Sequence, residues 1–434
     1  MSCVLVWNLS TAKTWWMNCV LSKFICTFAF AFNPLNKYIV MIQKHLRLLP
    51  LFAMLAFASV SSAQVDFTPI FTQIKLEARA DFDYYHTNTH ESVFGTRANE
   101  NQYGFHGRYF NFVIGGPLGE KFSYFFRQRI VATPGDVSLF DNTDFLYLNY
   151  MPSKNWMIRV GKDALAVGGF EYDAPPINVL FSTHYWDNFY CFQPAVAAAY
   201  KTDDANQMFL LQVANSPYVH YGAGLGFAPG SEWKSGLLSF NAFYSGKFGH
   251  FKVLHSVNMF ERPDHKFMNY IALGHELEYD KWDIYVDLIH RANALNDWGN
   301  TFAVVSCANL YFKHGFNIFV KGAYEQNNSY EVIPGYGIGS GLFDCFGEAG
   351  HTYLTYGLGA EYRPEACPDF RLHAFLANRR TTYSEILNID DISPVNNVTQ
   401  NSLRFNIGIT WDMDIHRMLK DRIAKTLSEK TSLE

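Results

Sequence analysis

The sequence predicts an all-β fold, a transmembrane antiparallel β-barrel of about 16 strands with short periplasmic turns and long external loops. Its composition is the first reason. Of 434 residues, 17% are aromatic and 17% are charged, and the mean hydropathy is close to zero. A soluble domain carries about 25% charged residues and a helical membrane protein is more apolar, whereas a barrel strand alternates lipid-facing with water-facing residues. Period-2 alternation and the lengths of the connections are the other two reasons.

The amino-terminal region is predicted to contain a secretory signal peptide. Residues 41–63 have the features of a signal peptide, with basic Lys44 and Arg47, an apolar stretch and small residues up to Ala63. We expect cleavage after Ala63 and a barrel over residues 64–412. A signal peptide acts from the start of its own chain, so we interpret residues 1–40 as a non-native upstream extension. The alternative, a membrane anchor over residues 20–32, is too short to span a bilayer and contains Lys23.

Alternating segments follow one another along the remaining chain. In the first, Ile74, Leu76 and Ala78 share one face while Lys75 and Glu77 share the other. The alternation predicts sixteen strands, at 71–85, 103–115, 121–132, 143–151, 156–165, 190–201, 206–215, 235–246, 250–261, 268–280, 282–292, 301–313, 316–326, 351–363, 369–380 and 401–412. Each is close to the length that a tilted strand needs to cross a bilayer.

The connections between these segments alternate in length. The short ones are 116–120, 152–155, 202–205, 247–249, 281, 314–315 and 364–368. The long ones are 86–102, 133–142, 166–189, 216–234, 262–267, 293–300, 327–350 and 381–400. Short turns at one end and long loops at the other are typical of outer-membrane barrels, so we expect the cell outer membrane as the location and its lipids as partners.

The orientation of the side chains follows from the cost of burying charge in lipid. On the last strand, Leu403, Phe405 and Ile407 alternate with Arg404 and Asn406. An arginine near the bilayer midplane costs roughly 2–4 kcal/mol, so the apolar face points outward. This orientation predicts inward-facing basic residues on one stretch of wall: Lys75, Arg79, Arg127, Arg129, Arg371, Arg379 and Arg404. It predicts inward-facing acidic residues across the lumen: Glu276, Glu278, Asp283 and Asp287.

The third long loop, 166–189, carries Glu171, Asp173 and Asp187 together with Pro175 and Pro176. Our hypothesis is that the loop folds into the lumen and sets its acidic groups against the basic wall, which narrows the channel and creates a transverse field. The alternative is that a hydrated interior simply tolerates scattered charges of both signs. The sequence leaves both open.

Two segments resemble the phosphate-selective porin O and P family. They are RVGKDALAVGGFEYDAPP, residues 159–176, and GGPLGEKFSYFFRQRI, residues 115–130. The resemblance implies a sixteen-stranded porin, a homotrimer, a constricting third loop and a solute route along basic residues, to which Arg127, Arg129 and Arg159 are candidates. The many lumen carboxylates argue against strict phosphate selectivity. We expect passive diffusion of small hydrophilic solutes or ions, with anions such as phosphate among the candidates.

Other functional classes find little support in the sequence. The net charge of −5 argues against a nucleic-acid partner. Cys191, Cys307, Cys345 and Cys367 form no CxxC pair, so we expect no metal site and no cofactor. No GxSxG, HExxH or glycine-rich phosphate loop occurs, so we expect no enzyme. A barrel with a mainly adhesive or structural role through its external loops is the alternative function. Residues 413–434 show helical spacing, and we interpret them as a short amphipathic periplasmic tail.

Overall fold

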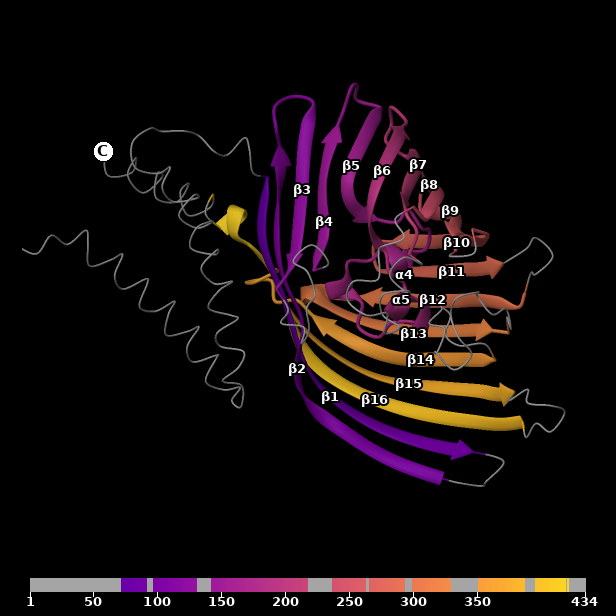
Figure 1. The fold of residues 1–434 in the computed structure, drawn as a ribbon. Helices are drawn as coiled ribbons and strands as arrows, with labels where there is room; N and C mark the ends of the chain where they lie inside the picture. Colours follow the sequence, from indigo (N-terminus) through magenta and orange to yellow (C-terminus); the bar gives the residue numbers. More distant parts are fainter. Residues whose placement is uncertain are drawn as a thin grey trace, which may run out of the picture. The chain divides into compact units, whose positions relative to one another are not determined.

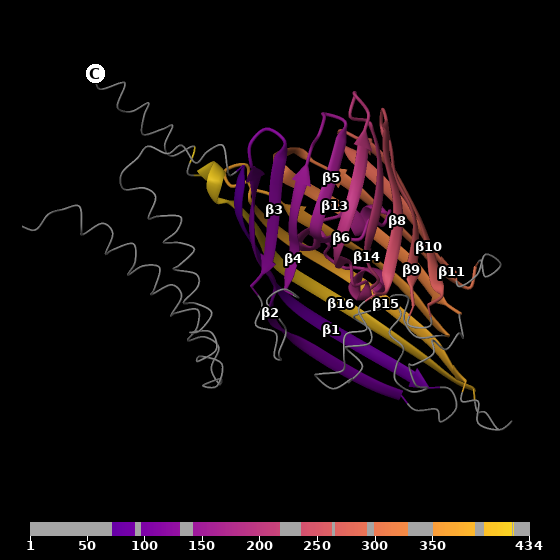
Figure 2. The ribbon, with the colours of Figure 1, turned by 45° about the horizontal axis from the view of Figure 1, so that its top comes forward.

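In the computed structural model, sixteen antiparallel strands close into one barrel (Figures 1 and 2). The structure describes residues 72–91, 97–130, 142–217, 236–262, 265–292, 299–328, 350–386, 395–418 and 420. The strands are β1 (Gln73–Glu91), β2 (Arg97–Pro117), β3 (Phe122–Arg129), β4 (Thr143–Tyr150), β5 (Trp156–Ala164), β6 (Phe192–Lys201), β7 (Gln207–Asn215), β8 (Leu238–Phe248), β9 (Phe251–Glu261), β10 (Phe267–Tyr279), β11 (Trp282–Ala292), β12 (Thr301–Tyr311), β13 (Phe316–Asn327), β14 (His351–Tyr362), β15 (Phe370–Ile386) and β16 (Val395–Asp414). The predicted fold class and strand number are therefore confirmed.

The barrel closes by pairing its first strand with its last. β1 pairs β16 along nearly its whole length, from Lys75 opposite Asp414 to Glu91 opposite Val398. Every other strand pairs with its neighbours in the chain, so no strand has an open edge. Among the described residues, no helix is long and apolar enough to span a membrane.

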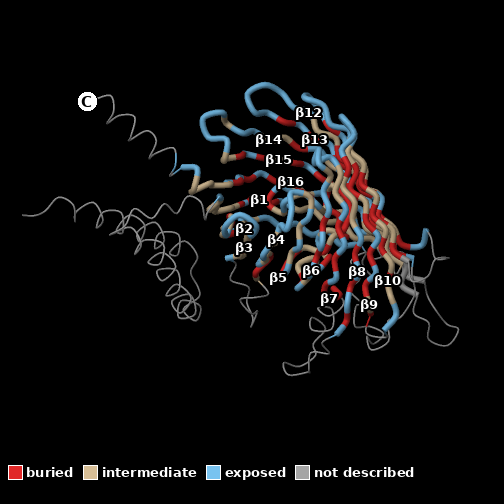
Figure 3. Tube along the Cα trace, turned by 90° about the horizontal axis from the view of Figure 1, so that it is seen from above, coloured by how far each residue is buried: buried red, intermediate tan, exposed pale blue. Residues whose placement is uncertain are grey.

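The two faces of the wall differ as the alternation predicts (Figure 3). On β16, Ile407 is 52% exposed and Phe405 42%, while Asn406 between them is fully buried. The same contrast recurs on β13, where Val320 is exposed and Lys321 is buried. Outward apolar residues that no protein atom covers are suited to lipid, and the inward polar residues line the interior.

Four strands extend further than the sequence predicts. The segments 86–91 and 97–102, expected as loop, continue β1 and β2, and β15 and β16 also run past their expected external ends. The alternation of apolar and polar residues stops where the lipid ends, but backbone pairing does not depend on lipid. Polar pairs continue the ladder, such as Asn88 with Asn99 at 2.6 Å and Thr87 with Ser402 at 3.1 Å.

Aromatic residues bracket most of the short turns. The rings of Tyr279 and Trp282 stack with centroids 4.6 Å apart, and Trp156 lies 5.2 Å from Tyr200. Such pairs suit the membrane interface. Tyr311 differs, because its hydroxyl donates inward to Asp283.

Residues 1–71, which hold the expected extension and signal peptide, lie outside the described part of the chain. At the other end, β16 reaches Asp414, and residues 415–418 continue as helix. The side chain of Asp414 accepts a hydrogen bond from Arg417 N at 2.9 Å, which caps this turn.

Candidate functional site

The third long loop is the only long connection that the structure describes throughout, and it lies inside the barrel. It contains α4 (Phe170–Asp173), η2 (Pro176–Asn178) and α5 (His184–Asn188). Figure 1 shows α4 and α5 in the interior, beside β11, β12 and β13. The loop turns inward at Gly168 and Gly169, where a Cβ on Gly168 would lie 2.5 Å from Leu254 O. Gly169 has φ 104°, which side chains other than glycine rarely adopt.

Two wall carboxylates hold the backbone N–H groups of the loop. Asp287 on β11 accepts from Phe170 N at 2.8 Å and from Glu171 N at 2.9 Å. Glu325 on β13 accepts from His184 N and Tyr185 N, both at 2.8 Å. Both carboxylates are fully buried. Each one satisfies the first N–H groups of a short helix, which have no partner within the helix.

Wall cations hold the carbonyl oxygens of the same loop. Arg79 on β1 donates to Val179 O at 2.6 Å, and Arg371 on β15 donates to Ile177 O at 3.0 Å. Arg379 donates to Ser182 O at 2.6 Å, and Lys321 on β13 to Phe181 O at 2.7 Å. The loop backbone is thus bound between wall anions and wall cations that match its own dipoles.

A buried ion pair ties the loop to β13. Lys321 Nζ lies 2.5 Å from Glu171 Oε1, and both side chains are less than one-tenth exposed. The other carboxylate oxygen of Glu171 accepts from Thr183 Oγ1 at 2.8 Å, so the pair also joins α4 to α5. Satisfied buried charges of this kind fix a conformation because either partner alone is costly.

Apolar contacts complete the anchorage. Tyr185 of α5 and Phe189, which directly follows α5, pack in a core with Phe260, Met268 and Tyr270 of β9 and β10. Phe181 packs against Phe319 and Phe375, with ring centroids 5.9 and 5.2 Å away. The ring of His184 stacks on Tyr353 at 4.2 Å. Burial, together with nearby Arg379, lowers the pKa of His184 to about 4, so its ring is neutral near pH 7.

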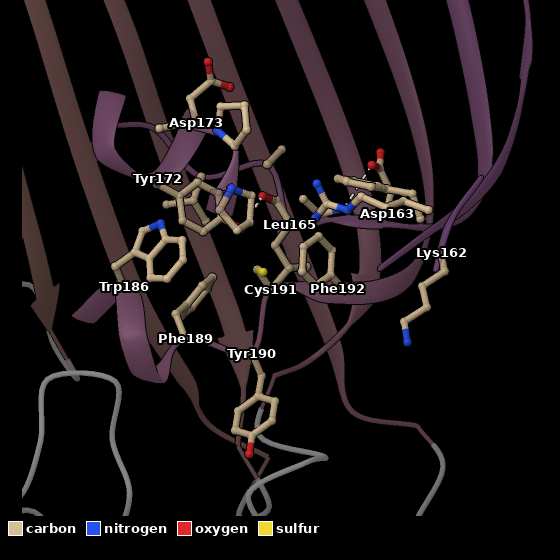
Figure 4. A pocket seen from close by; sticks show the side chains of 18 of the residues that line it. Lys162, Asp163, Leu165, Tyr172, Asp173, Trp186, Phe189, Tyr190, Cys191 and Phe192 are labelled. Carbon is tan, nitrogen blue, oxygen red and sulfur yellow. Dashed lines mark hydrogen bonds between the residues drawn. The ribbon is translucent and has the colours of Figure 1, made fainter. Parts of the chain in front are cut away.

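A cavity of about 1050 Å³ remains between the loop and the wall formed by β2 to β8 (Figure 4). The wall supplies Arg127, Arg129 and Arg159, and the loop supplies Asp173 and Asp187. A smaller cavity of about 470 Å³ lies on the side of the loop that faces β11 to β15 and includes Asn178. The larger cavity is therefore the candidate functional site.

The arginines of the cavity are partly neutralised. Asp144 lies 3.0 Å from Arg127 Nη2 and 2.7 Å from Arg129 Nε. Arg159 Nη1 donates to Asp163 at 2.8 Å. Aromatic rings also contact the guanidinium groups, with Arg159 4.0 Å from the centroid of Tyr147 and Arg127 4.6 Å from that of Phe145.

Comparison with known proteins identifies the family. The family model for phosphate-selective porin O and P matches residues 73–296, which is just over half of the chain. The chain belongs to this family. It is an outer-membrane porin, with a fold of the kind these channels share. No curated protein matches the sequence.

Several solved porin structures are similar to this porin in fold. An anion-selective porin from Comamonas acidovorans is 9% identical, with 78% of this chain and 99% of that one covered and a TM-score of 0.48. The outer membrane channel DcaP of Acinetobacter baumannii is 12% identical, with 77% and 96% covered and a TM-score of 0.47. OmpT of Vibrio cholerae is 10% identical, with 78% and 97% covered and a TM-score of 0.44.

The basic residues expected to line the pore fall into two groups in this porin. Arg127, Arg129 and Arg159 border the large cavity. Arg79, Arg371 and Arg379 bind the loop, Arg404 pairs with Asp83 at 2.8 Å, and Lys75 pairs with Asp412 at 3.2 Å. The second group lies on the inward face, but its side chains are occupied by protein partners.

The acidic residues are divided in a similar way. Of the loop acids, Asp173 and Asp187 border the cavity, whereas Glu171 is buried against Lys321. On the opposite wall, Asp287 binds loop N–H groups and Asp283 accepts from Asn309 at 2.7 Å. Glu276 and Glu278 each lie 2.9 Å from Lys252.

Sequence reasoning missed three of the residues that hold the loop: Lys321, Glu325 and Ser256. Their inward orientation was predictable from the two-residue period of their strands, because Val320 and Tyr324 on β13 and Val257 on β9 take the outward face. Their partners were not, because Gly168 N donates to Ser256 Oγ at 2.8 Å across 88 residues of chain. No periodic pattern indicates contacts between a loop and distant strands.

Proposed function

We propose that this porin allows passive diffusion of small hydrophilic solutes and ions through the cavity between the third loop and strands β2 to β8. The observation that supports the proposal most is the one-sided position of the loop. Apart from Ala166 N, which donates to Gln212 of β7, its backbone is bound to β1, β9, β11, β13 and β15, and the cavity lies on the side facing β2 to β8. Of the two cavities beside the loop, this one offers the larger space for a solute that crosses the barrel.

We further propose that the ion preference is weak. The cavity is bordered by four basic residues, Arg127, Arg129, Arg159 and Lys162, and by three acidic ones, Asp163, Asp173 and Asp187. Asp144 on β4 offsets a further positive charge through its ion pairs with Arg127 and Arg129. The wall arginines and the loop carboxylates face each other across the cavity. We propose that this arrangement orients polar solutes as they pass and does not exclude ions of either charge.

Labelling of matched loop positions tests the route. In a variant whose four mature cysteines are replaced by alanine, D173C places a thiol in the large cavity and N178C places one in the small cavity; both native residues are exposed on the same loop. After reaction with a methanethiosulfonate reagent, D173C channels are expected to lose most of their single-channel conductance, while N178C channels keep most of theirs.

The conductance measurements are made in planar lipid bilayers, and three of their outcomes would contradict these proposals. Equal loss in both variants would refute the proposed route. A large reversal potential under a salt gradient would refute weak selectivity. Absence of stepwise current from the unmodified protein would refute diffusion altogether and favour the adhesive or structural role, since only a pore gives such steps.

We also propose a homotrimer without enzymatic activity, as membership of the porin family supports. Analytical ultracentrifugation in a density-matched detergent is expected to give the mass of three chains. A mass of one chain would contradict this.

A further inference from the structure

The large cavity is unusually aromatic for a route of hydrophilic solutes. Nine of the described residues that border it are aromatic. Tyr109, Phe145 and Tyr147 belong to the wall, whereas Tyr172, Trp186 and Phe189 belong to the loop. Figure 4 shows the rings of Tyr172, Trp186, Phe189 and Phe192 around the hollow. A strongly hydrated ion gains nothing from such surfaces, whereas a flat apolar group gains about 25 cal/mol per Å² of area removed from water.

Unused donors lie beside these rings. Arg129 uses its Nε on Asp144, and its side chain remains 40% exposed. Its guanidinium lies 5.5 Å from the centroid of Phe192, on which Arg127 also lies, at 5.4 Å. The Nη2 atom of Arg127 is buried 3.0 Å from Asp144, so Arg129 is the arginine of this pair whose side chain is open to the cavity. Arginine N–H groups next to an aromatic surface suit a planar carboxylate, which accepts two parallel hydrogen bonds.

We propose that this cavity is a binding site for small organic anions with a flat apolar body, such as aromatic carboxylates. The carboxylate binds Arg129 and the ring lies between the aromatic residues of the wall and those of the loop, including Trp186. This inference rests on the proposed function, because it names the solute class that the same cavity favours.

Inorganic phosphate fits the cavity less well. Arg127 and Arg129 both pair with Asp144. Arg159 donates to Asn149, Asp163 and the Met157 sulfur. A phosphate would have to compete with these carboxylates and lose its hydration against apolar rings. An organic carboxylate needs only one free guanidinium edge and recovers free energy from the burial of its ring.

Block of the chloride current in planar bilayers tests the inference, with benzoate as the probe. Acetate matches the charge of benzoate without a ring, benzyl alcohol matches its ring without a charge, and inorganic phosphate represents the rival anion. Benzoate is expected to reduce the current at a concentration about tenfold or more below that needed for any of the three, which is at least 1.4 kcal/mol of preference.

Three variants locate the site. R129Q removes the open guanidinium. W186L removes an aromatic ring of the loop but keeps the backbone hydrogen bond from Trp186 N to Thr183 Oγ1, which caps α5. Each is expected to weaken benzoate block about tenfold while keeping regular conductance steps, which show an intact barrel. K252Q is the matched control, because Lys252 is inward-facing but does not border the cavity, and it is expected to leave the block unchanged.

The outcomes separate the two proposals. Regular channels on which benzoate acts no better than acetate or phosphate overturn the inference and leave the diffusion route standing. Equal loss of block in K252Q and R129Q also overturns it, because the effect would then reflect the general charge of the lumen. A protein that gives no current at all refutes the proposed function itself.

Discussion

Replacing Asp287 by asparagine and Glu325 by glutamine is expected to release the third loop from the wall. Each carboxylate accepts two backbone N–H groups, whereas an amide has one oxygen and presents its NH₂ group to the second N–H. A charge-assisted hydrogen bond contributes about 1.5–3 kcal/mol, so each replacement removes about 2–3 kcal/mol of anchorage. The doubly substituted channel should conduct more current in each step and flicker between levels.

Asp283 supplies a matched control for this prediction. It is a buried carboxylate on the same face of β11, but it accepts hydrogen bonds from Asn309 and Tyr311 rather than from the loop. D283N should therefore leave the current steady. Hydrogen exchange checks the cause, because the amides of Phe170, Glu171, His184 and Tyr185 should exchange faster in the D287N/E325Q variant only. Steady current and unchanged exchange would show that the loop does not depend on these carboxylates.

Replacing Lys321 by methionine is expected to destabilise the inserted loop more than any other single change. The substitution leaves Glu171 buried without its cation, and removing one member of a buried pair costs about 3–5 kcal/mol. Amides of residues 165–191 that exchange through loop release should do so about a hundredfold faster or more.

A double-mutant cycle with E171Q separates the pair from simple loss of packing. If the cost is that of an uncompensated charge, the K321M/E171Q double variant should recover most of the exchange protection lost in K321M. A double variant as unprotected as K321M would mean that the lysine acts through its other contact, Phe181 O at 2.7 Å.

Much of the fold was predictable because a barrel wall obeys a local rule. The strands follow the same two-residue period, apart from register shifts at Arg79/Ala80 and at Arg127/Gln128. On β16, Leu403, Phe405 and Ile407 therefore identify the lipid face without reference to other strands. The alternation of apolar and polar residues is not required beyond the lipid. For this reason the ends of β1, β2, β15 and β16 were expected as loops. There, polar side chains pair on both faces and the sequence shows no contrast between them.

The candidate site was predictable only in outline. The acidic third loop and the inward-facing arginines Arg127 and Arg129 were inferred from residues and orientation, whereas the inward course of the loop was one of two hypotheses that the sequence left open. The partners of individual charges were not: Glu171 pairs with Lys321 at a distance of 150 residues, and Arg371 binds Ile177 O at a distance of 194. Charges that look equivalent along a strand separate into loop anchors and cavity residues according to where the loop lies.

The sequence by itself determined the barrel, its strand number and which face meets lipid, because the cost of exposing a polar side chain to hydrocarbon acts on every strand separately. Only the tertiary structure decided which side of the lumen the loop occupies and which charges remain available to solutes. That choice depends on contacts between the backbone of one segment and Asp287, Glu325, Lys321 and Arg79, which lie on three different strands, β11, β13 and β1. No local sequence pattern encodes such long-range contacts.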